Sequence, residues 1–203
     1  MVRRILLYFE GAKPLREAFH VFLAPLIGAA RARHMSLRLV SGGDTISTLT
    51  KFAIALETET DAIALVLIDS DSPKTVDDSP VDFVSQRWHV AVPEGVREDQ
   101  IQFMVQVMEA WFLAQKEKLA AYYGTGFSRS ALPGNPHVEE VPKSDVLNGL
   151  SQATRHTQKG CYHKVRDAVP LLSDLDPGRV REAAPHCDRL LATLERLVDG
   201  SVS

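Results

Sequence analysis

The sequence predicts an α/β protein with a mostly parallel four-stranded sheet, flanked by helices and followed by a helical C-terminal portion. Short apolar runs alternate with longer segments in which apolar residues recur every three or four positions. One run, residues 62–68, is apolar throughout, which is typical of a strand buried on both faces of a parallel sheet. Alternation of strands and helices in this order favours parallel pairing with right-handed crossovers.

The first elements are a strand and a long helix. Residues 3–9 form a short apolar run, and Glu10 stands at its carboxyl end. Apolar residues then recur at helical spacing over residues 15–30, and Pro14 stands where a first helical turn tolerates proline. Because proline removes a backbone N–H, Pro25 is expected to kink this helix.

The second and third strands follow with a helix between them. Residues 36–40 alternate weakly and are predicted to be extended. Asp44 can cap a helix over residues 46–56, and residues 62–68 form the third strand. The next stretch, residues 72–98, is polar and rich in proline, so we expect a long loop with room for one short helix.

The remaining chain changes from one further strand to helices. Residues 101–107 are predicted to be the fourth strand and to run directly into a helix that ends near Tyr123. The sequence is therefore divided into two parts, an α/β core over residues 1–123 and a helical extension over residues 124–203. The extension is expected to pack on the core within one globular unit. The expected helices of the extension are 144–153, 165–173 and 185–198.

Composition indicates an ordinary globular protein. The chain has 203 residues, 45% hydrophobic and 24% charged, which suits one domain with a real core. No apolar run reaches the roughly 18 residues that span a bilayer, so no membrane partner is expected. Glu10 comes too early for a secretory signal, and we expect a cytoplasmic protein with Cys161 and Cys187 reduced. The net charge of -3 does not indicate nucleic-acid binding by the whole surface.

Four acids are predicted to lie at one edge of the sheet. Glu10 follows the first strand, Asp69 and Asp71 follow the third, and Glu109 follows the fourth. Ligands of parallel sheets bind beyond the carboxyl ends of the strands, and clustered carboxylates suit Mg²⁺ or Mn²⁺. We therefore assign Glu10, Asp69 and Asp71 as metal ligands and all four acids as catalytic candidates. One alternative is that the aspartates merely mark the end of a strand. Another is that Glu109 merely stabilises the N-terminus of a helix by interacting with the helix dipole.

One local basic segment stands out in a weakly acidic chain. Residues 154–166 contain four Lys or Arg residues and no acid. Such a segment can contact phosphates beside the acids, or it can be a solvated loop between helices. The candidate phosphate-binding residues are Lys13, Arg155, Lys159 and Lys164.

The order of these motifs resembles the Toprim fold, a Rossmann-like fold of topoisomerases, primases and certain nucleases. In that family a Glu follows the first strand and an Asp-x-Asp the third, here Glu10, Asp69 and Asp71. Residues 104–114, MVQVMEAWFLA, are similar to the signature of the uncharacterised bacterial domain-of-unknown-function family four-two-seven-six. The resemblance implies a Mg²⁺ site and a companion ATPase, but no established reaction. It continues through residues 131–133, 138–143, 153–155 and 159–164.

Two classes of function are therefore compared. The first is a Mg²⁺-dependent, nuclease-like phosphodiester hydrolase acting on nucleic acid, within a defence or mobile-element system. The second is a non-catalytic or partner-dependent subunit that uses the same fold beside an ATPase. Haloacid-dehalogenase-like phosphatases and nucleotide-sugar glycosyltransferases also use Asp-x-Asp. The former place it on the first strand, however, and the latter usually need a longer chain.

Overall fold

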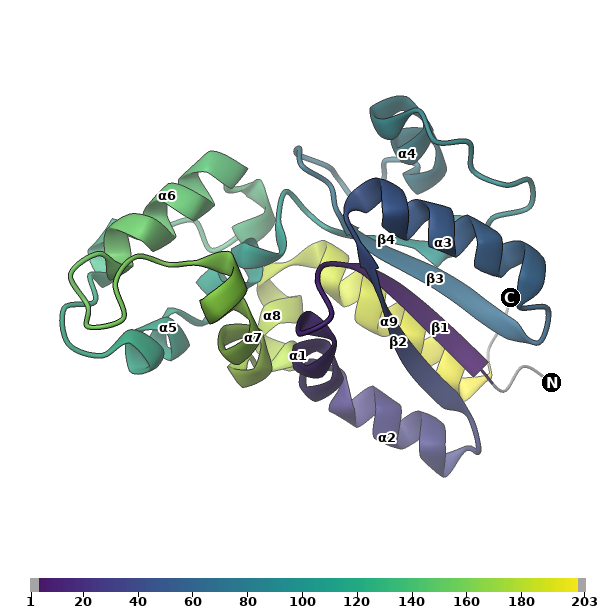
Figure 1. The fold of residues 1–203 in the computed structure, drawn as a ribbon, viewed down its shortest axis with the longest axis horizontal. Helices are drawn as coiled ribbons and strands as arrows, with labels where there is room; N and C mark the ends of the chain where they lie inside the picture. The colour runs from purple at the N-terminus through teal and green to yellow at the C-terminus, as the bar shows by residue number, and fades with distance from the viewer. Residues whose placement is uncertain (1–3, 201–203) are drawn as a thin grey trace.

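The computed structural model describes residues 4–200 and contains one sheet of four parallel strands (Figure 1). The strand order is β2-β1-β3-β4. β1 pairs with β2, with a shift of register between Phe9 and Glu10, and it also pairs with β3, which in turn pairs with β4. The predicted fold class is thereby confirmed as a mixed α/β protein with a parallel sheet. The strands are β1 (Arg4–Glu10), β2 (Ser36–Gly43), β3 (Ala62–Asp69) and β4 (Ile101–Met104).

Helices cover both faces of the sheet and make three layers (Figure 1). One face packs against α1 (Leu15–Phe22), α2 (Ala24–Ala32) and α9 (Pro185–Asp199), and the other against α3 (Thr45–Thr58) and α4 (Pro80–Trp88). In β3, Leu65 and Leu67 belong to the first core, whereas Val66 and Ile68 belong to the second. This alternation explains the unbroken apolar run, because both faces of β3 are buried.

The chain after β4 is mostly helical. Figure 1 shows α5, α6 and α7 grouped beside the sheet, while α9 returns along it. The apolar core of these helices is continuous with that of the sheet, since Leu150 and Leu172 belong to the same buried cluster as Leu65. The elements are η1 (Glu98–Gln100), η2 (Met108–Gln115), α5 (Lys116–Tyr123), η3 (Arg129–Ala131), η4 (Val138–Glu140), α6 (Lys143–Thr154), α7 (Lys164–Asp174) and α8 (Pro177–Ala183).

The long helix expected over residues 15–30 is two helices. α1 ends at Phe22, and Leu23 lies between it and α2. Pro25 stands in the first turn of α2, where its missing N–H costs no hydrogen bond. The proline therefore starts a new helix instead of kinking an existing one. The short helix α8 was not predicted from the sequence.

The fourth strand is shorter than expected and its helix begins differently. β4 ends at Met104, and Gln106 adopts a left-handed backbone with φ 61°, which ends the extended conformation. The chain then forms the 3₁₀ helix η2, and α-helical geometry begins only at Lys116. The predictions of a strand to residue 107 and of a regular helix from residue 108 are therefore wrong.

Two local predictions are confirmed, the helix cap at Asp44 and the short helix in the long loop. Asp44 caps α3, and its carboxylate accepts a 2.8 Å hydrogen bond from the N–H of Ser47. α4 is the short helix of the long loop, and Cys161 and Cys187 are both free thiols. Within residues 4–200 no helix combines the length and apolar character needed to cross a membrane.

Candidate functional site

The sheet reverses its direction of growth between β1 and β3. The chain passes from β1 to β2 on one side and then returns to place β3 on the other side of β1. In open α/β sheets such a switch point opens a crevice beyond the carboxyl ends of the two strands. Glu10 is the last residue of β1 and Asp69 the last of β3, so the topology brings these two acids to the crevice.

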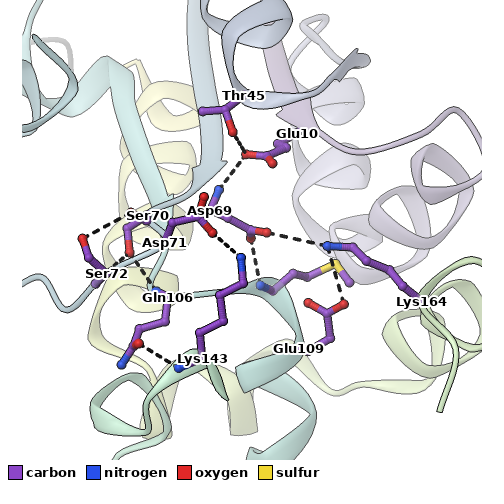
Figure 2. Close-up of polar contacts among 11 residues, drawn as sticks. Glu10, Thr45, Asp69, Ser70, Asp71, Ser72, Gln106, Glu109, Lys143 and Lys164 are labelled. Atoms are coloured by element: carbon purple, nitrogen blue, oxygen red, sulfur yellow. Dashed lines mark hydrogen bonds and ion pairs between the residues drawn. The ribbon is translucent and has the colours of Figure 1, made fainter. Parts of the chain in front are cut away.

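Glu10 is tied directly to β3 (Figure 2). Its Oε2 accepts a 3.1 Å hydrogen bond from the N–H of Asp69 and a 2.9 Å hydrogen bond from the hydroxyl of Thr45. Burial raises the pKa of Glu10, and the nearby charge of Asp71 raises it further, while the two hydrogen bonds oppose the shift. Glu10 therefore fixes the end of β3 by accepting its backbone N–H.

Asp69 is the most strongly perturbed acid of the site. Its Oδ1 accepts a 2.8 Å hydrogen bond from the N–H of Met108, and its Oδ2 lies 3.7 Å from Nζ of Lys164. Burial raises the pKa of Asp69 to about 8, with further contributions from Glu10 and Glu109 that Lys164 opposes. Without an added cation, burial therefore favours the protonated form of Asp69.

Glu109 lies in the first turn of η2 and is fully buried. Its Oε1 accepts a 3.0 Å hydrogen bond from the hydroxyl of Tyr162 and lies 3.5 Å from Nζ of Lys164. Its Oε2 is buried without a hydrogen-bond partner in residues 4–200. Burial alone would lower the pKa of Lys164, but the charges of Glu109, Asp69 and Glu10 raise it. One ammonium group thus faces three carboxyl groups.

Asp71 belongs to the same loop but makes a different contact. Its backbone is left-handed, with φ 55°, and its Oδ1 lies 2.5 Å from Nζ of Lys143 (Figure 2). Asp69 instead pairs with Lys164, so each aspartate of the Asp-x-Asp pair faces a different lysine. No three His, Cys, Asp or Glu side chains within residues 4–200 are arranged so that they could hold a metal ion together. Metal binding by Glu10, Asp69 and Asp71 stays a prediction.

The basic segment does not act as one patch. Lys164 reaches the acids, but Nζ of Lys159 lies over the ring of Tyr122, 4.7 Å from its centroid. Arg155 and Lys13 are exposed. In the described part of the chain, none of Lys13, Arg155 and Lys159 forms an ion pair with the acids of the site. Lys164 is therefore the phosphate candidate that the structure brings to the crevice.

Gln106 is a part of the site that the sequence did not reveal. Its carbonyl accepts a 3.1 Å hydrogen bond from the N–H of Asp71, and its N–H donates a 2.7 Å hydrogen bond to the hydroxyl of Ser70. Its side-chain oxygen accepts from the N–H of Lys143 at 2.9 Å. Gln106 and Asp71 both hold left-handed backbones, a costly conformation that concentrates at functional sites. Nothing in the local sequence distinguishes a glutamine that adopts it.

Lys143, Tyr162 and Thr45 are the other missed contributors. Lys143 and Tyr162 lie in segments that carry the family resemblance, and that was the available signal for them. Thr45 gave no signal, because a threonine at the start of a helix is ordinary.

Comparison with known families identifies the family of this chain. The family described as Domain of unknown function (DUF4276) matches residues 15–195, so the chain belongs to that family. Asp69, Glu109 and Lys164 lie inside the matched range, and Glu10 lies just before it. No curated protein and no solved structure matches the chain.

Proposed function

We propose that this chain is a cytoplasmic, divalent-metal-dependent phosphodiester hydrolase of Toprim-like fold that acts on nucleic acid. The supporting observation is the meeting of Glu10, Asp69 and Glu109 at the switch point of a parallel sheet, around the single ammonium of Lys164. Within residues 4–200, Lys164 is the cation that pairs with Asp69 and Glu109, and such an excess of acidic groups favours a bound metal cation.

The residues suit Mg²⁺ or Mn²⁺ in the way that phosphoryl-transfer sites hold them. Mg²⁺ is usually bound by one or two carboxylates together with waters and substrate phosphates, so a cage of three acids is not needed. Asp69 and Glu109 would hold the ion, because both face the same ammonium and Oε2 of Glu109 has no partner in residues 4–200. When bound, the ion would polarise a phosphoryl oxygen and lower the pKa of a water.

The neighbouring residues would take supporting roles. Glu10 holds the end of β3 through the N–H of Asp69, and Tyr162 orients Glu109 through its hydroxyl. The side chains of Lys164 and Lys143 are each about half exposed, so both ammonium groups can turn to phosphate oxygens of a bound nucleic acid.

The proposal is tested by cleavage with a matched acid control. Purified wild type, Asp69→Asn and Glu57→Gln would be incubated with single- and double-stranded DNA and RNA in Mg²⁺ or Mn²⁺. Glu57 is exposed on α3, so its substitution should leave cleavage unchanged. Asp69→Asn should reduce the rate at least about 100-fold, because it removes a carboxylate ligand of the ion that would stabilise charge on the reacting phosphate. Equal cleavage by wild type and Asp69→Asn, or none by either, would refute the hydrolase.

A non-catalytic subunit that works beside an ATPase is the second candidate. The specific observation in its favour is that Lys143 and Lys164 already pair with the Asp-x-Asp carboxylates. Calorimetric titration separates the two functions. A hydrolase should bind Mg²⁺ or Mn²⁺ at about millimolar concentration or below. Absence of binding, together with absence of cleavage, would support the subunit.

A further inference from the structure

A pocket of about 410 Å³ lies at the far end of η2 from the acid site. The helix η2 carries Glu109 in its first turn, whereas its later residues Leu113 and Ala114 line the pocket. The other walls are the start of α5, the loop over residues 129–137 and the helix α8. The acids of the switch point and their lysine partners do not line this α5–α8 pocket, so it is a separate site. A space of this size accommodates a small organic ligand.

The loop that forms one wall of the α5–α8 pocket is held in place by polar and packing contacts. Nζ of Lys116 donates a hydrogen bond to the carbonyl of Pro133, and Oδ1 of Asn135 accepts the N–H of His137 at 2.9 Å. Pro133 also lies close to α6, because a Cβ placed on Gly149 would be only 2.7 Å from its ring. The pocket is therefore formed before a ligand binds, and a preformed site lowers the cost of binding.

Two cations on the lining, Lys116 and Arg129, have no carboxylate partner. The ion pairs formed among residues 4–200 include neither of them. Lys116 is bonded to a neutral carbonyl, and the side chain of Arg129 is exposed and accessible to a ligand. Burial lowers the pKa of Lys116, and the charge of Arg129 lowers it further, so the two cations lie close enough to repel each other. An anion placed between them would relieve this repulsion.

The acids of the lining do not supply that anion. Glu182 lies 3.8 Å from Arg179 on the same helix, so these two charges offset each other. Glu117 is exposed and is not among the causes of the pKa shift of Lys116, so it does not neutralise that ammonium. The positive charge of the α5–α8 pocket is therefore available to an external anion.

The floor of the α5–α8 pocket is apolar. Leu113 is buried, and Ala114 and Ala183 are partly buried against the same core. A single inorganic phosphate would fill only part of the pocket and would leave this apolar surface without contact. An organic phosphate uses both parts, with its phosphate at the cations and its organic portion on the floor.

We infer that the α5–α8 pocket binds the phosphate group of an organic phosphate, with Lys116 and Arg129 as its ionic partners. Arginine suits this role, because its planar guanidinium can donate two parallel hydrogen bonds to phosphate oxygens. Two sources share this chemistry, a free nucleotide and the phosphorylated end of a nucleic-acid chain. The inference goes beyond the proposed hydrolase and does not depend on it, since no acid of the switch point takes part.

The inference is tested by binding in EDTA, which removes any metal ion that could hold phosphate at the acid site. The wild type would be titrated with AMP, adenosine, inorganic phosphate, and a short thymidine oligonucleotide with and without a 5′-phosphate. The Nε–H resonance of Arg129, assigned by its absence from Arg129→Gln, would be followed by NMR. AMP should bind at millimolar concentration or below and shift this resonance, whereas adenosine should bind more weakly because it lacks the phosphate.

Two variants with the same change of charge provide the comparison. Arg129→Gln should weaken AMP binding about 10-fold, because it removes a charged hydrogen-bond donor of the phosphate. Arg87 is exposed on α4 and does not line the pocket, so Arg87→Gln should bind AMP as the wild type does. Thermal unfolding of each variant shows whether it is folded.

The outcomes separate the two sources and can overturn the inference. Tighter binding of AMP than of the phosphorylated oligonucleotide assigns the pocket to a free nucleotide, and the reverse order assigns it to a nucleic-acid end. The inference is wrong if no phosphate compound binds, if adenosine or inorganic phosphate binds as tightly as AMP, or if Arg129→Gln binds as the wild type does. Binding in EDTA without cleavage in Mg²⁺ would refute only the hydrolase, and cleavage without such binding would refute only the phosphate pocket.

Discussion

Individual side chains at the switch point are held in unlike environments. Glu10 accepts two hydrogen bonds from neutral groups. Asp69 accepts one hydrogen bond from a backbone N–H and lies 3.7 Å from the ammonium of Lys164. Glu109 has one oxygen without a hydrogen-bond partner within the described residues. Burial raises the pKa of Asp69 to about 8, the largest resolved shift among these acids. Asp69 therefore dominates the pH dependence of this site.

Substitution of Asp69 by Asn should make the free energy of unfolding less dependent on pH. The folded-state pKa lies above the unfolded value, so the native state binds the proton more tightly. This contribution to the free energy of unfolding is present below about pH 4 and is lost as the pH rises to about 8. In EDTA, the wild type should lose roughly 1 kcal/mol or more relative to Asp69→Asn between about pH 5 and pH 8. Urea unfolding at several pH values measures this difference.

The matched control is Asp145→Asn, at an exposed aspartate in the first turn of α6. Its stability should run parallel to that of the wild type over the same range of pH. If the Asp69→Asn curve also runs parallel to the wild type, Asp69 is ionised in the folded protein and the assigned protonation is wrong.

At the level of secondary structure, the segment between β4 and η2 builds the site. Gln106 ends β4 with its left-handed backbone, and its hydrogen bonds fix the loop of Ser70 and Asp71. The chain then turns so that the N–H of Met108 meets Asp69 and Glu109 enters the crevice. The left-handed backbone of Gln106 thus directs the chain so that both Met108 and Glu109 contact the site.

Two substitutions at Gln106 separate its backbone from its side chain. Gln106→Ala and Gln106→Gly both lose the side-chain hydrogen bonds to Lys143 and Glu139. Only glycine adopts φ 61° without strain, so the alanine variant should be less stable than the glycine variant by about 1 kcal/mol. Denaturant unfolding of the two proteins gives the difference directly.

Gln152 in α6 provides the control with the opposite sign. It is exposed and helical, so Gln152→Ala should be more stable than Gln152→Gly by about 1 kcal/mol. The same order at both positions would mean that the left-handed backbone of Gln106 is not enforced in solution.

For the molecule as a whole, the two ends of the chain depend on each other. α9 packs on β4 and against α2, and α7 packs against α1. The buried cluster runs from Ile5 in β1 to Leu197 in α9 without a break. The helical C-terminal portion therefore completes the core of the sheet.

The fragment 1–123 should consequently fail to fold by itself. Without α9 it exposes the sheet face that carries Ile5, Leu65 and Met104. We expect the full chain to unfold in one cooperative transition, with far-UV circular dichroism and tryptophan fluorescence coincident. The fragment should show no such transition and no near-UV signal. Two separate transitions in the full chain, or a cooperatively folded fragment, would show that residues 124–203 are an independent unit.

The sequence by itself determined the features that depend on near neighbours in the chain. Buried strands and amphipathic helices follow from side-chain periodicity, so β1, β3 and α3 lie close to their predicted positions. The acids at the strand ends were visible for the same reason. Irregular backbone at Gln106 and the separation of α1 from α2 were not, because apolar periodicity continues through both places.

Tertiary structure decided which charges meet. The ion pair between Asp71 and Lys143 joins residues 72 positions apart, and the hydrogen bond from the N–H of Asp69 to Glu10 spans 59 positions. Such contacts depend on strand order and on the packing of distant helices, which local patterns do not encode. For this reason Lys164 and Lys159 look alike in the sequence, yet one reaches the acids and the other lies over Tyr122.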